Sequence, residues 1–419
     1  MEAHAPVVPS KSKEDGALTA LVFGASGITG HAILQALLTH PSPTTFSRVV
    51  GLTNRPLSAA IAQLPADPRI ELYSGIDLLS RESSLLQLQH VPGVDLVTHV
   101  FYAAYGGHGS SFEDLKNVNS EMLTNAVGGV EICCPKLQFI TLNTGGKVRS
   151  PLGALLHPPR SPLTWFVQAY GVEFYGQNGI VYEPPLLEST PRIPSPHAEK
   201  VFYYAQHDIL RVASEGKPWT FCEIRPDVIV GFVPNNNAMN MAQSLALYFS
   251  LYHELEGEGS EVVFPYGAES WEALHTDSSS DLLGRMHVHC ATNPQTCGNG
   301  SIFNCVDGPP FAWSSLWPRL TAYFGLKGMG PNASPKPQAI EGYMLEHRAR
   351  WPDFVRKHGL REGALEATGW KFADDVCGIT FRRDMSSEAR NSVGFTEIRD
   401  IAEGYERAFQ EMRKARIIP

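Results

Sequence analysis

Three regularly spaced glycines near the N-terminus constrain the fold more than any other feature of this chain. An apolar run from Leu18 to Phe23 leads into Gly24, Gly27 and Gly30, and apolar residues at helical spacing follow them. A glycine turn between a strand and a helix is typical of a Rossmann dinucleotide site, where it allows a sharp turn, close approach to the pyrophosphate and tight helix packing. We therefore expect the pyrophosphate to be bound by the turn residues Gly24, Ser26, Gly27, Ile28, Thr29 and Gly30.

Strand-like and helical segments alternate after this turn. Further apolar strands are expected near residues 48–55, 70–76, 97–104 and 137–144, with a helix over 118–127. This alternation predicts an α/β fold with a doubly wound, parallel Rossmann-type sheet. We expect a disordered arm over 1–17, a Rossmann domain over 18–235, and a smaller, mostly helical C-terminal portion over 236–419 that covers the substrate. Part of 270–305 is expected to return to the Rossmann domain.

The end of the second predicted strand indicates which dinucleotide is bound. NAD sites usually place an acidic residue there to hold the ribose 2′-hydroxyl, but this chain has Thr53, Asn54 and Arg55. An arginine can pair bidentately with a 2′-phosphate, so NADP(H) is the predicted cofactor, with Asn54 and Arg55 as ligands. The alternative is that Arg55 is an ordinary surface residue. Asp77 and Leu78 follow the third strand, where an adenine would lie.

Composition excludes several classes of function. The formal net charge of −9 disfavours nucleic acids and anionic membranes as partners, and no apolar run is long enough to span a bilayer. The seven cysteines form no C-x-x-C pair, no ligand set has metal-like spacing, and the N-terminus lacks the apolar core of a secretory signal. We expect a cytoplasmic protein that acts on a small molecule without a metal, and we leave a homodimer open.

The usual catalytic motif of short-chain dehydrogenases, Tyr-x-x-x-Lys, is missing. The tyrosines that begin the expected helix are Tyr203 and Tyr204, and the residues four positions later are His207 and Asp208. Neither replaces a lysine. The lysine has instead moved to Lys147, in the stretch Thr144-Gly145-Gly-Lys147 after the fifth strand.

This departure, with several other segments, resembles the progesterone 5β-reductase/iridoid synthase-like enone reductases, an atypical branch of the short-chain dehydrogenases. The resembling segments are Thr98-His-Val-Phe-Tyr, Thr144-Gly-Gly-Lys147, Phe202-Tyr-Tyr-x-x-x-Asp-Ile-Leu, Arg225-Pro-x-x-x-x-Gly231-Phe-x-Pro234, Asp277-Ser-Ser-Ser-Asp-Leu, Ile302-Phe-Asn304 and the final Ala415-Arg-Ile-Ile-Pro419. The resemblance implies an NADPH-dependent 1,4-reduction of an α,β-unsaturated carbonyl (an enone or enal), of a kind found in secondary metabolism.

The resemblance also implies roles for individual residues. Tyr204 would donate a hydrogen bond to the carbonyl oxygen, with Tyr203 as the second choice, and Lys147 would bind the nicotinamide ribose. Thr144, Gly145 and Val228 would contact the cofactor. Trp271 and Tyr343 either line the substrate pocket or pack in the core.

Two other functions remain open at this stage. The same nucleotide site would serve a carbonyl reductase or an epimerase, or a non-catalytic regulator that senses NADP.

Residues 148–168 interrupt the resemblance with a proline-rich stretch that has neither helical nor strand periodicity. Removing them joins Lys147 to Ala169-Tyr170-Gly and restores a family-like continuation. A valine codon begins with GT and Gln168 can be encoded by CAG, so we suggest a retained short intron. A real loop over the active site is the competing interpretation.

Overall fold

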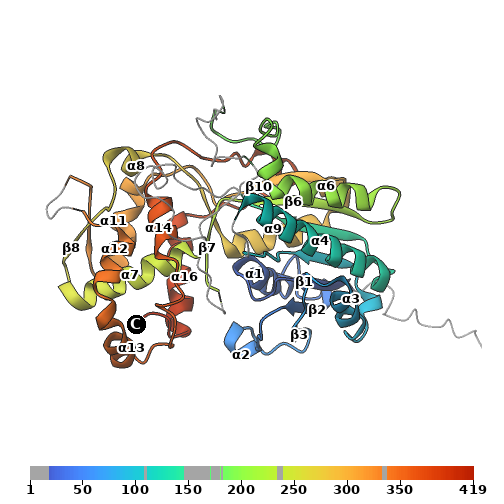
Figure 1. The fold of residues 1–419 in the computed structure, drawn as a ribbon, viewed down its shortest axis with the longest axis horizontal. Helices are drawn as coiled ribbons and strands as arrows, with labels where there is room; N and C mark the ends of the chain where they lie inside the picture. Colours follow the sequence, from blue (N-terminus) through green and yellow to red (C-terminus); the bar gives the residue numbers. More distant parts are fainter. Residues whose placement is uncertain are drawn as a thin grey trace, which may run out of the picture.

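We describe the protein from a computed structural model, in which the described residues are 18–107, 111–145, 170, 180, 183–233, 239–332 and 337–419. The expected arm over 1–17, Lys147 and the segment 148–168 lie outside these residues. Two lobes are visible in Figure 1: a sheet flanked by helices and a mostly helical portion that contains the C-terminus.

A parallel sheet forms the first lobe. Its strands run in the order β10-β6-β5-β4-β1-β2-β3, and every pairing between neighbours is parallel. Their bounds are β1 Leu18–Phe23, β2 Phe46–Thr53, β3 Ile70–Ser74, β4 His99–Tyr102, β5 Phe139–Asn143, β6 Thr220–Pro226 and β10 Ser301–Cys305. The sheet confirms the predicted Rossmann-type fold class. Because the strands are parallel, their carboxyl ends meet at one edge, where ligands of such sheets bind.

Helices bury both faces of the sheet. On one face α1 (Ile28–Leu37) and α9 (Ser280–Thr292) pack against each other and against strand residues such as Val22 and Phe101. The other face is covered by α3 (Arg81–Gln89), α4 (Phe112–Cys133) and α6 (Phe202–Ser214), through residues such as Leu123 and Leu210. Burial on both faces explains the near-continuous apolar strands.

Two segments beyond residue 235, β10 and α9, belong to this lobe. Strand β10 extends the sheet beyond β6, and α9 packs on α1. Strand β7 (Val228–Val230) comes directly after β6 in the chain. It pairs in parallel with β9 (Asp277–Ser279) and forms a second, two-stranded sheet. The short elements around the lobe are α2 Ala59–Ala62, η1 Val94–Leu96, η3 Ala198–Lys200, α10 Pro294–Cys297 and α15 Glu388–Ser392.

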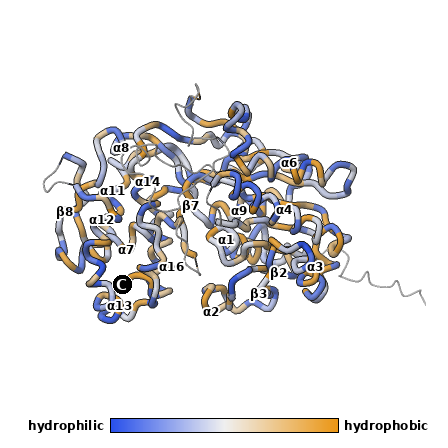
Figure 2. Tube along the Cα trace, in the orientation of Figure 1, coloured by the Kyte–Doolittle hydropathy of each residue, from blue (hydrophilic) through white to orange (hydrophobic). Residues whose placement is uncertain are grey.

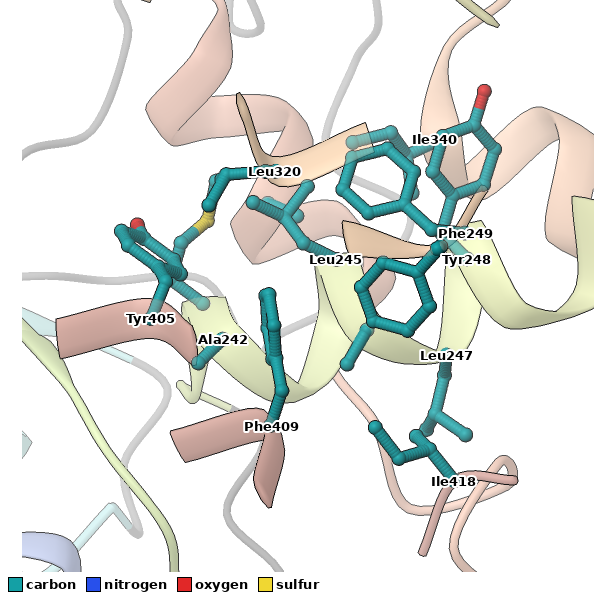
Figure 3. Packing of buried hydrophobic residues seen from close by; sticks show 14 of the residues in the cluster. Ala242, Leu245, Leu247, Tyr248, Phe249, Leu320, Ile340, Tyr405, Phe409 and Ile418 are labelled. Carbon is teal, nitrogen blue, oxygen red and sulfur yellow. The ribbon is translucent and has the colours of Figure 1, made fainter. Parts of the chain in front are cut away.

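The C-terminal lobe is built around α7 (Met241–Glu256), whose residues from Met241 to Leu251 are all buried. A helix that is buried on every side lies inside the protein, and its neighbours surround it. Figure 3 shows Leu245 and Phe249 of α7 against Leu320, Ile340 and Phe409. The surrounding elements are α8 Ala268–Glu272, α11 Trp313–Tyr323, α12 Ile340–Glu346, η4 Arg348–Arg350, α13 Trp351–His358, α14 Trp370–Cys377, α16 Ile401–Lys414 and the strand pair β8 Glu261–Val263 with β11 Lys327–Met329.

A buried polar cluster joins the β7–β9 pair to the C-terminal lobe. Arg383 lies 2.5 Å from Asp227, and the Tyr405 hydroxyl donates to Asp277 at 3.1 Å. Asp307 accepts hydrogen bonds from both the amide and the hydroxyl of Ser279. These groups are at most 3% exposed, so each depends on its protein partners for solvation.

No helix in the described ranges is both long and apolar enough to cross a bilayer.

Candidate active site

The glycine turn has the backbone geometry that its spacing predicts. Gly24 has a φ of +79°, and a Cβ at this position would lie 2.6 Å from the carbonyl oxygen of Ala103, at the end of β4. A Cβ on Gly30 would overlap the carbonyl oxygen of Gly24. Only glycine fits either position without displacing backbone.

The N-terminus of α1 is suited to an anion. Gly27 is the N-cap, no side chain caps the helix, and its first turn carries no acidic residue. The first amides of a helix point outward along its axis and favour negative charge. Ile28 and Thr29 are buried, at 6% and 4% exposure. The turn and this helix end together fit the pyrophosphate of a dinucleotide.

Hydrogen bonds tie the glycine turn to the end of β2. The Thr53 hydroxyl lies 2.8 Å from Ser26 Oγ and 3.0 Å from the carbonyl oxygen of Arg55. Asn54 donates to the carbonyl oxygen of Ile76, beyond the neighbouring strand β3. Asn54 and Arg55 are exposed and no acid follows β2, so this edge presents a cation where an NAD site would present a carboxylate.

The expected adenine-side residues lie beyond β3. The carboxylate of Asp77 accepts a hydrogen bond from the amide of Leu79 at 3.0 Å, which holds this loop. Leu78 is buried, and its carbonyl oxygen accepts from Asn125 of α4. Asp77 remains partly exposed beside the same sheet edge as Asn54.

The two adjacent tyrosines of α6 face different environments. A Cβ on Gly145 would lie 3.4 Å from the Tyr203 phenolic oxygen, so this phenol reaches the carboxyl end of β5. The Tyr204 hydroxyl instead accepts a hydrogen bond from the amide of Ile193 at 3.2 Å, and its ring is 6% exposed. Arg192 lies over the Tyr204 ring, 4.8 Å from its centre. The structure therefore brings Tyr203 to the sheet edge and packs Tyr204 away from Gly145.

A buried charged network lies behind Tyr203. His207, one helical turn after Tyr203, contacts Glu223 with 2.8 Å between Nδ1 and Oε2. Arg225 and the Thr144 hydroxyl both donate to the other carboxylate oxygen, at 2.7 and 2.9 Å. Burial opposes ionisation of Glu223, yet Arg225 and His207 outweigh it and hold its pKa at about 2. The position of the usual lysine thus carries a histidine bound to a buried carboxylate.

Sequence reasoning missed this network. Glu223 and Arg225 are two residues apart on β6, so they point to the same face of the strand. A Glu-x-Arg pair inside an otherwise apolar strand was the available signal, because buried charges must be paired.

The other predicted residues occupy varied positions. Lys147 lies outside the described residues, and the chain leading to it leaves β5 through Thr144 and Gly145. Val228 is fully buried in β7, directly after Asp227. Trp271 and Tyr343 pack in the C-terminal lobe, Trp271 on Phe264 and Tyr343 on Tyr248 and Tyr252.

A search of the described ranges finds no group of three His, Cys, Asp or Glu side chains placed to hold a metal ion.

Comparison with known proteins shows the family of this chain. The model of a family described as a PRISE-like Rossmann-fold domain matches residues 20–157 and 161–419. The short chain dehydrogenase sirQ of Leptosphaeria maculans is 33% identical over 404 residues, which cover 96% of this chain and 97% of that protein. The 3-oxo-Delta(4,5)-steroid 5-beta-reductase of Arabidopsis thaliana is 28% identical over 414 residues, covering 98% and 95%. An (S)-8-oxocitronellyl enol synthase of Nepeta racemosa is 27% identical over 402 residues, covering 96% and 93%.

A solved structure shares the fold at low sequence identity. The UDP-glucose 4-epimerase of Thermus thermophilus, in complex with NAD, aligns with a TM-score of 0.57 and 14% identity over 95% of this chain and all of that one. This likeness supports the Rossmann-type fold. From the family match and the full-length similarity to sirQ, this chain belongs to the PRISE-like Rossmann-fold family of short-chain dehydrogenase/reductase-type proteins.

Proposed function

We propose that the protein is an NADPH-dependent reductase of the C=C bond of α,β-unsaturated carbonyl compounds. The observation that carries this proposal is the Tyr203 phenol against Gly145, at the sheet edge where the glycine turn opens. Relatives named as a steroid 5-beta-reductase and as an enol synthase support the choice of an enone as substrate. A place in secondary metabolism follows only from the resemblance described for the sequence.

The cofactor would be held at two places along the sheet edge. Gly24, Gly27 and the first amides of α1 would bind the pyrophosphate, and Asn54 with Arg55 would bind the adenosine ribose and its 2′-phosphate. NADPH, when bound, supplies the hydride that adds to the β-carbon of the enone. The absence of an acid after Thr53 supports NADP(H) over NAD(H).

Tyr203 would meet the negative charge that develops on the carbonyl oxygen. Hydride addition to the β-carbon leaves an enolate, and a positioned O–H donor stabilises it before a proton is taken up at the α-carbon. Tyr203 replaces Tyr204 as our choice, because its phenol lies beside Gly145, whereas the Tyr204 hydroxyl lies at the Ile193 amide within a buried cluster. Lys147 remains a prediction from sequence as the ammonium that supports the phenol.

The buried network would set the position of Tyr203. His207 is fixed to Glu223, and Glu223 is fixed to Arg225 and Thr144, so the helix bearing Tyr203 is tied to β6 and to the end of β5. Thr144 then places its neighbour Gly145 beside the phenol. Such fixed geometry is what a preorganised donor requires.

Consumption of NADPH tests the proposal. The purified protein should oxidise NADPH in the presence of a cyclic enone or an aliphatic enal. The matched saturated ketone or aldehyde is the control. Oxidation with the saturated compound at an equal rate would instead establish carbonyl reduction, and no oxidation with any enone of a broad panel would reject the proposal.

A further inference from the structure

A groove with basic walls lies between the two lobes, beside Arg55. Its volume is about 680 Å³, and its lining comes from the segment after β2 and from two segments of the C-terminal lobe. The charged residues of the lining are Arg55, Arg361, Glu362, Lys414 and Arg416. In Figure 1, α2 lies at the end of the sheet lobe nearest to the C-terminus, and Figure 2 shows α2 as a hydrophobic tip.

Positive charge dominates this groove. Four of its lining residues are cationic, and Glu362 is the one acidic residue among them. Lys414 pairs with Glu411 of α16 at 2.6 Å, which offsets part of its charge. Arg361 is partly buried, and burial lowers the pKa of its guanidinium. Arg55, Arg361 and Arg416 thus bring cationic residues from both lobes to the lining of one space.

The backbone of Arg416 supplies a second, independent observation. Arg416 follows α16 with a φ of +54°, and the amide of Ile417 donates back to Met412 to close the helix end. This left-handed position after a helix is the one that glycine most often occupies, because a Cβ is strained there. A residue with a long cationic side chain thus occupies a position where a Cβ costs stability, and this residue lines the groove. Such strain is typical of a residue retained for binding.

The groove lies close to the expected cofactor. Arg55 follows Thr53, whose hydroxyl contacts Ser26 in the glycine turn and the carbonyl oxygen of Arg55 itself. One wall of the groove therefore continues the edge at which the adenosine half of a dinucleotide would lie. A phosphate monoester bound by Arg55 would enter the groove and meet the cations of the C-terminal lobe.

We propose that the C-terminal lobe completes the 2′-phosphate site of NADPH, with Arg361 and Arg416 facing Arg55 across the groove. This inference rests on the proposed choice of NADP(H) as cofactor. It assigns a second role to the C-terminal lobe: besides covering the substrate, it distinguishes NADPH from NADH. Binding of NADPH would then stabilise the two lobes against each other more than binding of NADH does.

Direct binding measurements on the full-length protein test the proposal without relying on activity. The dissociation constants of NADPH and NADH are compared by calorimetry for the wild type, Arg416→Gly, Arg361→Gln and Arg55→Gln. Arg356→Gln is the matched control, because this side chain lies on α13, is 77% exposed and pairs only with Asp353 among the ion pairs of the described residues. Thermal unfolding of each variant without ligand is recorded in parallel.

The Arg416→Gly variant separates binding from folding. Its backbone strain is relieved, so its unfolding midpoint should equal or exceed that of the wild type. Its NADPH affinity should fall by about three- to tenfold while its NADH affinity is unchanged, as expected for loss of one partly exposed charge contact. Arg361→Gln should show the same selective loss, and Arg356→Gln should show none.

Three outcomes would overturn the inference. If Arg55→Gln weakens NADPH binding selectively but Arg416→Gly and Arg361→Gln do not, the C-terminal lobe takes no part, and the cofactor proposal stands alone. If the wild type binds NADH as tightly as NADPH, the cofactor proposal fails and this inference fails with it. If Arg416→Gly weakens binding of inorganic phosphate to the NADH complex but leaves NADPH binding intact, the groove belongs to a separate phosphorylated ligand.

Discussion

The backbone amide of Ile193 donates a hydrogen bond to the hydroxyl of Tyr204, with 3.2 Å between nitrogen and oxygen. This contact gives Tyr204 a structural partner inside a small buried cluster that also contains Phe202 and Leu115. The neighbouring Tyr203 points its hydroxyl toward Gly145 instead. The side chains of adjacent helical residues point in directions about 100° apart. One tyrosine of the pair can therefore pack in the core while the other reaches the candidate site.

Exchange of each tyrosine for phenylalanine distinguishes these roles. Tyr203→Phe should lower kcat for enone reduction by about 100- to 1,000-fold, because it removes the donor to the developing oxyanion. Tyr204→Phe should keep kcat within a few fold and lose stability instead, because the Ile193 amide loses its acceptor. Steady-state kinetics measure kcat of both variants, and thermal unfolding measures their stability. A fully active Tyr203→Phe with an inactive but folded Tyr204→Phe would reverse the assignment.

Removal of the Arg55 guanidinium should change the cofactor preference. Arg55→Gln should raise the dissociation constant of NADPH by about tenfold, the effect expected for a charge-assisted contact to phosphate, and should leave NADH binding unchanged. Fluorescence titration with each nucleotide measures the two constants. Equal weakening for both nucleotides would show that Arg55 does not contact the 2′-phosphate.

Glu223 should be essential for stability. Glu223→Gln leaves Arg225 and His207 without their carboxylate in a buried site, so we expect about 3–5 kcal/mol of destabilisation. Urea unfolding measures the loss. The control is Glu215→Gln, which breaks the exposed pair with Arg211 and should stay within about 0.5 kcal/mol of the wild type. Equal stability of the two variants would contradict the role given to the network.

Asp307 should make the protein less stable at high pH. Burial raises the pKa of Asp307 from 3.8 to about 7, against the hydrogen bonds from Ser279. Between these two pKa values the folded state binds a proton that the unfolded state has lost. The contribution of Asp307 to stability is therefore fully present below about pH 4, and it is lost as the pH rises through about 7. The thermal midpoint should be lower at pH 8 than at pH 5.5.

Asp307→Asn tests whether this residue causes the pH dependence. An amide keeps an acceptor for the Ser279 amide but does not titrate, so the difference between the two midpoints should shrink. Glu223 does not interfere, because its lowered pKa of about 2 acts only in more acidic solution. A variant with the full wild-type pH dependence would exclude Asp307 as its source.

The fold was predictable because its signals are local. The apolar strands, the three glycines and the helix that follows them are contiguous in sequence, and the structure places Gly24 and Gly30 where a Cβ would collide with backbone. The lack of an acid after Thr53 is likewise visible in the chain itself. Such features depend on the backbone and on neighbours in sequence.

The site was only partly predictable because its remaining contacts are long-range. Tyr203 and Tyr204 begin the same helix, and only the packing of α6 decides which of them faces Gly145. The pairing of His207 with Glu223 and the groove lined by both Arg55 and Arg416 join segments that no spacing rule connects. Lys147 and the choice between a loop and a retained intron at 148–168 remain predictions, and the sequence of the transcript would decide the latter.

The position of transferred hydride tests the central claim most directly. The protein is supplied with NADPH carrying deuterium at C4 of the nicotinamide and with a conjugated enone, and the product is analysed by NMR. We predict deuterium on the β-carbon and an intact carbonyl group. Deuterium on the carbonyl carbon, giving an allylic alcohol, would contradict the assignment of 1,4-reduction.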